Sequence, residues 1–504
     1  MKRRFLLFFF LFTLLLITLT KEVYAELSKG DASIKQEVIY DLLVDRYHNL
    51  DRKGEEEVDI NDPFHYHGGD FKGITAQLEE IKHNGFTVLS LSSVFANASE
   101  GYHGYWIEDF YKIEEQFGGL EDLKELIETA HEKDLKVILE FVPNYVSVSS
   151  PLVAEKLEKD WFTEVKAEPT KATSWLDQVL QFNHQKEEVR EYLLDVALYW
   201  IETLSIDGYK IHAADQADEA FIKELTERIK KVYPDFYILV TSLQGASLEK
   251  FCQTETIDAI EDEGLRKELV AVFSQADVPV SRFTDYMKKF SCDKFLLKVD
   301  DRQSPRFSQR VAEEGRNHLT TWKLALSMLY FSPGIPLIYQ GSEVPMYGAS
   351  YPESEQLVDL IRKDPDLVQV FQRVGAAKEA FPALSYGSWE EIAVEGAFSI
   401  FKREWQGETV YVAVNNGSES HYVALENIEA GQQLRGLFYD DTVRADAEGK
   451  FYIGLDRETA DIFVLEEDEG IHWGFILLLS LIMLGFLAGL FYLSLRERKR
   501  KSLS

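Results

Sequence analysis

Short apolar runs alternate with amphipathic helical patterns from about residue 36 to residue 380. Several of the runs are almost continuously apolar, which is typical of parallel strands covered on both faces. The helical patterns between them include residues 120–133 and 188–204. These repeats predict a TIM (β/α)8 barrel over residues 36–382, with a doubly wound open sheet as the alternative. The eight predicted strands cover residues 38–45, 87–94, 136–142, 208–213, 236–240, 258–260, 295–299 and 336–339.

Two segments depart from this repeat. Residues 144–187 are longer than an ordinary loop between a strand and a helix, which predicts a small inserted subdomain. From residue 383 to residue 466, apolar and polar residues alternate between turn sequences. That pattern predicts a C-terminal antiparallel β-sandwich. Its predicted strands cover residues 393–401, 408–415, 421–425 and 451–455.

Both ends of the chain carry apolar segments beside basic residues. Residues 1–25 begin with a basic cluster and end at Ala25, which predicts a cleavable secretory signal, with an uncleaved anchor helix as the alternative. Residues 473–495 carry no charge and are long enough to cross a bilayer. The basic residues in 496–504 predict a cytoplasmic tail. The sequence thus predicts a single-pass cell-membrane protein whose body lies outside the cell.

The charge of the chain narrows the classes of partner. Its 504 residues include 86 acidic and 54 basic side chains, which gives a net charge of −32. Such a chain repels phosphate backbones, so nucleic acid is not an expected partner. A neutral ligand such as a sugar is compatible with this charge. The two cysteines, Cys252 and Cys292, exclude a disulfide-dense scaffold and leave open whether they pair.

Several motifs recur at or near the ends of the predicted strands, namely residues 39–47, 67–74, 101–106, 142–144, 207–210, 304–307 and 334–341. These motifs resemble those of the α-amylase family of glycoside hydrolases. The resemblance extends over residues 36–466 and includes the C-terminal sandwich. It implies a carbohydrate-binding site at the carboxyl ends of the strands, with α-glucan-type oligosaccharide as the ligand.

Catalysis in this family needs carboxylates, because a retaining glycosidase uses a nucleophile and a general acid about 5–5.5 Å apart. The resemblance places His212 at the nucleophile position, Thr241 at the acid position and Gln303 at the position of a third carboxylate. The sequence therefore predicts a catalytically inactive family member, a pseudoenzyme that binds α-glucan-type carbohydrate or a membrane or cell-surface protein. The alternative is an active α-glucan hydrolase or transglycosylase with non-standard or displaced catalytic groups.

Four nearby acids are candidates for such displaced groups. A carboxylate that is two or three strand positions away lies about 7–10 Å from its usual place, and even about 1 Å of misplacement can lower a rate 100-fold. We therefore expect none of them to substitute efficiently. The four acids are Glu140, Asp215, Asp300 and Asp301.

The resemblance also implies a set of sugar-binding residues. The aromatic faces of Tyr105 and Trp106 and the edge of His103 suit a neutral sugar. Maintenance of the fold is the alternative role for these three residues. Lys210 and Arg302 stand where the family has arginine and histidine. The predicted set is His103, Tyr105, Trp106, Lys210, Arg302 and Arg306.

Calcium is the one cofactor that the sequence allows. Asn144 matches a calcium ligand of the family, but Gln181 stands where the resemblance implies an aspartate. Nearer the N-terminus, Asn49, Asp51 and Asp70 offer the hard oxygen ligands that calcium prefers. A solvated acidic loop is the alternative interpretation of that segment.

Overall fold

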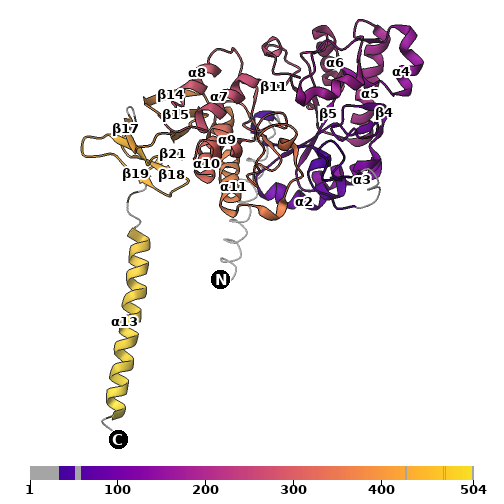
Figure 1. Ribbon diagram of the computed structural model, residues 1–504. Helices are drawn as coiled ribbons and strands as arrows, with labels where there is room; N and C mark the ends of the chain where they lie inside the picture. The colour runs from indigo at the N-terminus through magenta and orange to yellow at the C-terminus, as the bar shows by residue number, and fades with distance from the viewer. Residues whose placement is uncertain (1–32, 52–57, 426–427, 469, 471–472, 502–504) are drawn as a thin grey trace, which may run out of the picture.

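The computed structural model describes residues 33–51, 58–425, 428–468, 470 and 473–501 (Figure 1). Eight parallel strands form a closed barrel, which confirms the predicted TIM barrel and each of its strands. The open-sheet alternative is wrong, because the first strand pairs with both the second and the last. In order around the barrel, the strands are β1 (Ile39–Leu42), β2 (Val88–Leu91), β5 (Lys136–Phe141), β9 (Gly208–Ile211), β10 (Tyr237–Val240), β11 (Ala259–Glu261), β12 (Phe295–Leu297) and β13 (Ile335–Tyr339).

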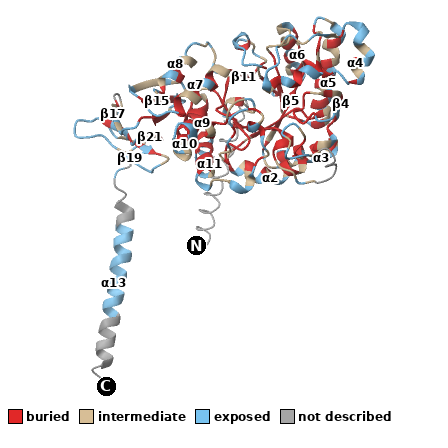
Figure 2. Cartoon of the chain, viewed as in Figure 1, coloured by how far each residue is buried: buried red, intermediate tan, exposed pale blue. Residues whose placement is uncertain are grey.

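Amphipathic helices cover the outside of the barrel, and Figure 2 shows buried residues concentrated where they meet the strands. The predicted helical patterns over 120–133 and 188–204 are confirmed as α3 and α5. The longer helices are α2 (Phe71–His83), α3 (Gly119–Glu132), α5 (Glu187–Leu204), α6 (Glu219–Val232), α7 (Glu263–Phe273), α10 (His318–Phe331) and α11 (Pro365–Ala380). The shorter ones are α4 (Pro151–Lys156), α8 (Ser281–Met287), α9 (Phe307–Glu313) and α12 (Ala383–Tyr386).

Single 3-10 turns connect many of these elements. They are η1 (Ile34–Gln36), η2 (Val44–Arg46), η4 (Glu115–Phe117), η5 (Leu157–Lys159), η6 (Lys171–Gln178), η7 (Glu249–Phe251), η8 (Glu353–Glu355) and η9 (Leu360–Arg362). Helix α10 differs from the outer helices because almost all of its residues from Thr321 to Phe331 are buried. It lies between the barrel and the C-terminal domain and contacts both.

Two small sheets lie beside the mouth of the barrel. A hairpin of β3 (Phe95–Asn97) and β4 (Ile107–Ile113) presents residues 98–106 as its loop. Within the predicted inserted segment 144–187, a three-stranded sheet forms from β6 (Tyr145–Ser147), β7 (Phe162–Thr163) and β8 (Val179–Phe182). The hairpin and this sheet place the 101–106 motif and η6 near the carboxyl ends of the barrel strands.

The C-terminal domain is antiparallel, as predicted, and consists of a six-stranded sheet and a two-stranded sheet. Apolar side chains of both sheets, among them Ile400, Tyr411 and Phe451, form one shared core. The larger sheet contains β14 (Glu390–Glu395), β15 (Phe398–Trp405), β16 (Glu408–Asn415), β18 (Gln432–Gly436), β19 (Thr442–Val443) and β21 (Thr459–Glu467). The smaller contains β17 (His421–Leu425) and β20 (Phe451–Leu455).

One predicted strand of this domain is wrong. Residues 393–401 do not form a single strand, because the chain turns at Gly396, whose φ is +61°. The two halves belong to β14 and β15, which pair with each other so that Glu395 lies opposite Phe398. The alternating pattern continues through the turn and therefore hides it.

The last helix, α13 (Trp473–Lys501), forms where the sequence predicts a membrane span over residues 473–495. Figure 1 shows it extending away from the C-terminal domain, and its side chains from Leu477 to Tyr492 are exposed. Among the residues that the structure describes, no helix is both long and apolar enough to cross a membrane, so the predicted span is not confirmed.

The predicted signal over residues 1–25 lies outside the described residues, as do residues 502–504 of the predicted tail.

The two cysteines, whose pairing the sequence leaves open, form a disulfide. The Cα atoms of Cys252 and Cys292 lie 5.7 Å apart, and the bond closes a loop across a sequence separation of 40 residues. The loop contains β11, α7 and α8, so the bond links the segment before β11 to the segment before β12.

Candidate functional site

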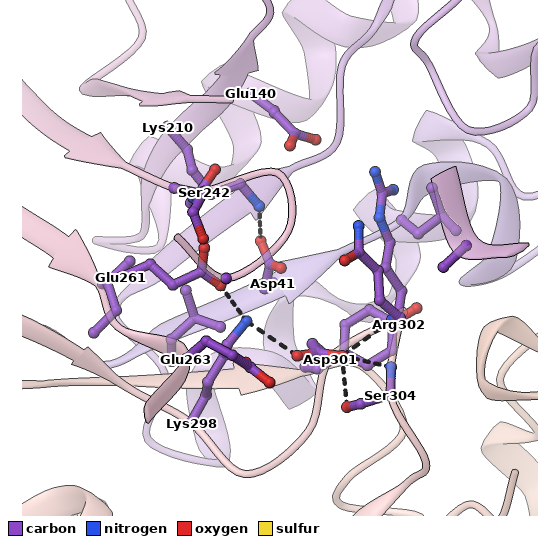
Figure 3. Close-up of a pocket in the computed structure, with 18 of the residues that line it drawn as sticks. Asp41, Glu140, Lys210, Ser242, Glu261, Glu263, Lys298, Asp301, Arg302 and Ser304 are labelled. Atoms are coloured by element: carbon purple, nitrogen blue, oxygen red, sulfur yellow. Dashed lines mark hydrogen bonds and ion pairs between the residues drawn. The ribbon is translucent and has the colours of Figure 1, made fainter. Parts of the chain in front are cut away.

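A cavity of about 330 Å³ opens at the carboxyl ends of the barrel strands (Figure 3). Strands β1, β5, β9 and β11 each bring one charged residue to it, and two more follow from β12. Because parallel strands end at the same rim of a barrel, residues far apart in the sequence meet here. These six are Asp41, Glu140, Lys210, Glu261, Lys298 and Asp301.

The cavity is lined by alternating charges that are paired with one another. Lys210 pairs with Asp41, and Lys298 lies between Glu261 and Asp301 in Figure 3. The Lys298 Nζ is 3.3 Å from the nearer Asp301 oxygen. Arg266 approaches the same Asp301 carboxylate at 3.2 Å. The carboxylates at the centre of the cavity are therefore neutralised by fixed cations.

These pairs outweigh the unfavourable effect of burial on charge. Burial alone would lower the pKa of Lys210, but Asp41 and Glu140 raise it above the ordinary lysine value. Burial would likewise raise the pKa of Asp301, but Lys298 and Arg266 lower it below the ordinary aspartate value. Asp301 is consequently ionised at neutral pH and is not a proton donor.

The predicted nucleophile position, His212, belongs to a buried network beside the cavity. Its Nδ1 lies 3.0 Å from Glu140 Oε1, and the Tyr105 hydroxyl donates to the same oxygen at 3.2 Å. The His212 ring also stacks on Tyr105, with 4.4 Å between ring centroids. The Nε2 of His212 is buried and has no hydrogen-bond partner among the described residues.

The other two predicted catalytic positions lie at the rim without a carboxylate. The Thr241 hydroxyl donates to the Ile211 carbonyl at 3.3 Å, so its proton is directed to the main chain. Gln303 is exposed, and its backbone N–H donates to Asp301 at 3.0 Å. Both residues line the cavity, whereas His212 does not. No standard nucleophile and acid pair forms at these three positions.

The four acids considered as displaced groups have different environments. Glu140 and Asp301 line the cavity, in the ion pairs already described. Asp300 is buried and accepts a hydrogen bond from the Ser342 hydroxyl at 2.9 Å. Asp215 accepts a hydrogen bond from the backbone N–H of Leu243 at 2.7 Å. Asp300 and Asp215 are therefore part of the supporting structure rather than of the cavity wall.

The predicted sugar-binding residues do not lie together on the cavity wall. Lys210 and Arg302 line the cavity, but His103, Tyr105 and Trp106 do not. Tyr105 is only 2% exposed, because Trp175 of η6 and the Arg302 guanidinium crowd its ring. The distances to its ring centroid are 4.5 Å from the Trp175 ring centroid and 4.7 Å from Arg302 Cζ.

The remaining members of that set have structural contacts. His103 is buried, and its Nδ1 accepts the backbone N–H of Tyr105 at 3.0 Å. Trp106 Nε1 donates to the Trp175 carbonyl at 2.9 Å, which links the β3–β4 hairpin to η6. Arg306 is 1% exposed and donates to the Gln340 carbonyl at 2.7 Å, below the cavity floor.

The residues predicted as calcium ligands are used in other interactions. Asp70 caps α2 through Gly73, and its other oxygen accepts the backbone N–H groups of Leu50 and Asp51. The Asp51 carboxylate pairs with Lys72 at 2.6 Å. Within the described ranges, no group of three or more histidine, cysteine, aspartate or glutamate residues could hold a metal ion. The predicted calcium site near Asn49 is therefore not supported by this part of the chain.

The second calcium position is also changed. Gln181 Nε2 donates to the Gln216 carbonyl at 2.8 Å, and Asn144 Nδ2 donates to the carbonyls of His212 and Ala213. The Oδ1 of Asn144 and the Oε1 of Gln181 are buried without a hydrogen-bond partner among the described residues. A neutral amide thus stands where the resemblance implies a carboxylate, which weakens the site for a doubly charged cation.

Sequence reasoning missed three residues that dominate the cavity: Glu261, Lys298 and Glu263. Glu261 directly follows the predicted strand 258–260, and Lys298 falls within the predicted strand 295–299. Charged residues at the carboxyl ends of barrel strands are a signal that could have identified the first two.

Comparison with known proteins identifies the family. The sequence profile described as "Alpha amylase, catalytic domain" matches residues 41–380, and the "Alpha-amylase C-terminal domain" profile matches residues 387–463. The chain belongs to the α-amylase family. The barrel, the hairpin loop over residues 101–106 and the C-terminal sheets agree with this family assignment.

Similar proteins include enzymes that act on α-glucans. A cyclomaltodextrinase from Geobacillus thermopakistaniensis is 26% identical over 447 residues, which cover 82% of this chain and 74% of the relative. The crystal structure of an Anoxybacillus α-amylase is 35% identical, with a TM-score of 0.82, and covers 88% of this chain and 100% of that chain. A Geobacillus thermoleovorans α-amylase complexed with acarbose is 32% identical, with a TM-score of 0.80 and coverages of 87% and 100%.

The names of these relatives favour the alternative functional prediction, an active α-glucan hydrolase or transglycosylase, over the inactive one. They give no support to a protein partner.

Proposed function

We propose that this α-amylase family member binds α-glucan-type oligosaccharide in the barrel cavity and does not cleave it by the nucleophile-and-acid route of glycosidases. The observation that carries the proposal is the cavity lining. The nucleophile and acid positions hold His212 and Thr241, and the central carboxylates are paired with lysine and arginine. The acarbose complex of a 32% identical relative supports the ligand class.

The cavity suits a ligand rich in hydroxyl groups. Its alternating carboxylates and ammonium groups offer both acceptors and donors at fixed positions, and their charges nearly cancel. Five carboxylates line it, namely Asp41, Glu140, Glu261, Glu263 and Asp301. Four cations balance them: Lys210, Lys267, Lys298 and Arg302. A sugar hydroxyl can exchange hydrogen bonds with such groups without bringing a charge into the cavity.

The same pairing disfavours glycosidic cleavage. An oxocarbenium-like transition state needs uncompensated negative charge beside it. Lys210, Lys298 and Arg266 neutralise the carboxylates that line the cavity. The Thr241 hydroxyl is far too weak an acid to protonate the leaving oxygen near pH 7.

A second candidate function is an active hydrolase in which Glu261 and Asp301 act in place of the usual carboxylates. The names of the relatives favour it over the first candidate. Its structural support is that both carboxylates contact the single Lys298 ammonium and face the same cavity. In that case Asp301, which remains ionised, would be the nucleophile, and Glu261 would act as the acid after taking a proton from solvent.

The binding proposal is tested by titrating maltoheptaose into the full chain and into a Glu261→Gln variant. The variant keeps the shape of the side chain but removes its charge and leaves Lys298 partly unpaired, so we expect affinity to fall severalfold. Glu79→Gln, on the outer surface of α2, is the matched control and should bind like the parent chain. Equal affinities in all three proteins would place the binding site elsewhere.

Removal of the Arg302 guanidinium should strengthen oligosaccharide binding. Arg302 lies over the Tyr105 ring, which Trp175 and His212 also contact, so removal of the guanidinium uncovers part of an aromatic surface on which a sugar could stack. We expect Arg302→Ala to bind maltoheptaose about three- to tenfold more tightly, the range of one aromatic contact. Lys267→Ala, which removes another cation from the cavity wall, is the control. Weaker binding by Arg302→Ala would show instead that the guanidinium contacts the ligand.

We also propose that the protein is exported, on the basis of the predicted signal over residues 1–25. The mature protein isolated from its native cells should then begin at Glu26. N-terminal sequencing checks this, and a mature chain that begins at Met1 would contradict cleavage.

A further inference from the structure

The outer face of the small C-terminal sheet carries an aromatic pair that the barrel cavity does not use. Along β17 and β20, Val423, Leu425, Phe451 and Ile453 face the domain core, in the alternation expected of paired strands. Tyr422 and Tyr452 belong to the opposite face and are 72% and 38% exposed. Their ring centroids lie 6.3 Å apart, and the ring planes are tilted by 58°.

A hollow of about 540 Å³ adjoins this pair. Tyr422 forms part of its wall together with Tyr439, which is 44% exposed and is positioned by a hydrogen bond from Lys323 at 3.3 Å. Gly454 lies directly opposite Tyr422 in the β17–β20 register and carries no side chain that would fill the hollow. Three tyrosines therefore border one connected surface.

Polar groups suited to hydroxyl ligands surround the rings. Ser420 donates to Asp456 at 3.1 Å, and the Asp441 carboxylate and Thr459 also line the hollow. The carboxylates disfavour an anionic ligand. A tyrosine exposed singly on a surface is ordinary. Here Tyr422 and Tyr439 line one hollow together with polar groups, and the Tyr452 ring lies beside Tyr422, so the three form an amphipathic surface of the kind that packs against a sugar ring.

The tilt between the rings favours a curved ligand. A flat β-linked glucan presents its sugar faces in nearly one plane, whereas an α-linked glucan winds and presents successive faces at an angle. Rings that are tilted by 58° match the second geometry. We propose that the surface formed by Tyr422, Tyr439 and Tyr452 is a second binding site for α-glucan chains, separate from the barrel cavity. The choice of an α-linked ligand rests in part on the proposed function of that cavity.

Calorimetric titration of maltoheptaose into the full chain tests this site. The parent chain should bind two molecules, and the Tyr422→Ala/Tyr452→Ala variant should bind one, with at least about a tenfold loss of affinity at the second site. Tyr422→Phe/Tyr452→Phe keeps the rings and should retain most of the binding. Tyr199→Ala, an exposed tyrosine on α5, is the matched control. Cellohexaose should show no binding at this surface.

The outcomes separate the two proposals. Two sites in the alanine variant would overturn the tyrosine site and leave the cavity proposal intact. One site in the parent chain that disappears in the alanine variant would support the tyrosine surface and overturn the cavity proposal. Absence of any binding would overturn both. Equal binding of cellohexaose would contradict the α-linked specificity.

Discussion

Restoration of three carboxylates at the barrel mouth is expected to raise hydrolysis of an aryl α-maltoside by at least about 100-fold, the scale of general acid–base catalysis. The changes are His212→Asp, Thr241→Glu and Gln303→Asp, because the motif resemblance predicts that these positions correspond to the nucleophile, the acid and the third carboxylate of the family. Lys210→Arg and Arg302→His accompany them, because both side chains adjoin the restored groups. Release of the aryl group measures the rate.

The matched control carries His212→Asn, Thr241→Gln and Gln303→Asn with the same two accompanying changes. It has nearly the same shape but no added carboxylates, so its rate should equal that of the parent chain. If the carboxylate variant is folded by circular dichroism and binds maltoheptaose, yet is no faster than this control, the assignment of the three positions is wrong.

Replacement of Lys378 by methionine is expected to remove a pH-dependent loss of stability. Lys378 on α11 is buried, and among the described residues the one hydrogen bond of its Nζ is to the Tyr330 carbonyl, at 3.4 Å. Burial, reinforced by Arg403, lowers its pKa to about 7 against the ordinary lysine value. Between that pKa and about 10.4, the unfolded chain binds more protons than the folded one, so stability rises with pH over this window.

The full rise attributable to Lys378 is about 5 kcal/mol in the free energy of unfolding. Denaturant titrations at pH 7 and at pH 10 should show most of this rise in the parent chain and none of it in Lys378→Met, which should also be more stable at pH 7 by about 2–4 kcal/mol. Lys112→Met, at a solvent-exposed position, is the control for general charge effects. A Lys378→Met variant that is less stable at pH 7 would show that the ammonium has a favourable partner.

The barrel was predictable from the sequence because its strands are covered on both faces. Such strands are continuous apolar runs, for example β10 and β13, and the helical periodicity between them is strong. The β14–β15 hairpin was not predictable from alternation alone, since the pattern continues through the turn at Gly396. The charge-free run over residues 473–495 predicts a membrane span. Among the described residues, however, no helix is both long and apolar enough to cross a membrane.

The sequence predicts which residues lie at the ends of the strands, but it does not predict which of these residues contact one another. The motif resemblance predicts roles for His212, Thr241 and Gln303, yet it does not show that Lys298 lies between Glu261 and Asp301. Those partners come from different strands, and their pairing depends on barrel register. For the same reason, the sequence predicts Tyr105 as a sugar platform, whereas the structure buries its ring beneath Trp175 and Arg302.

The most direct test of the central claim is the heat flow during titration of maltoheptaose into the full chain, with recovery of the sugar afterwards. We predict saturable binding heat that returns to the baseline after each injection, with the heptasaccharide intact. Sustained heat flow and shorter maltodextrins would contradict the claim and support catalysis by Glu261 and Asp301. Absence of any binding heat would contradict the proposed ligand.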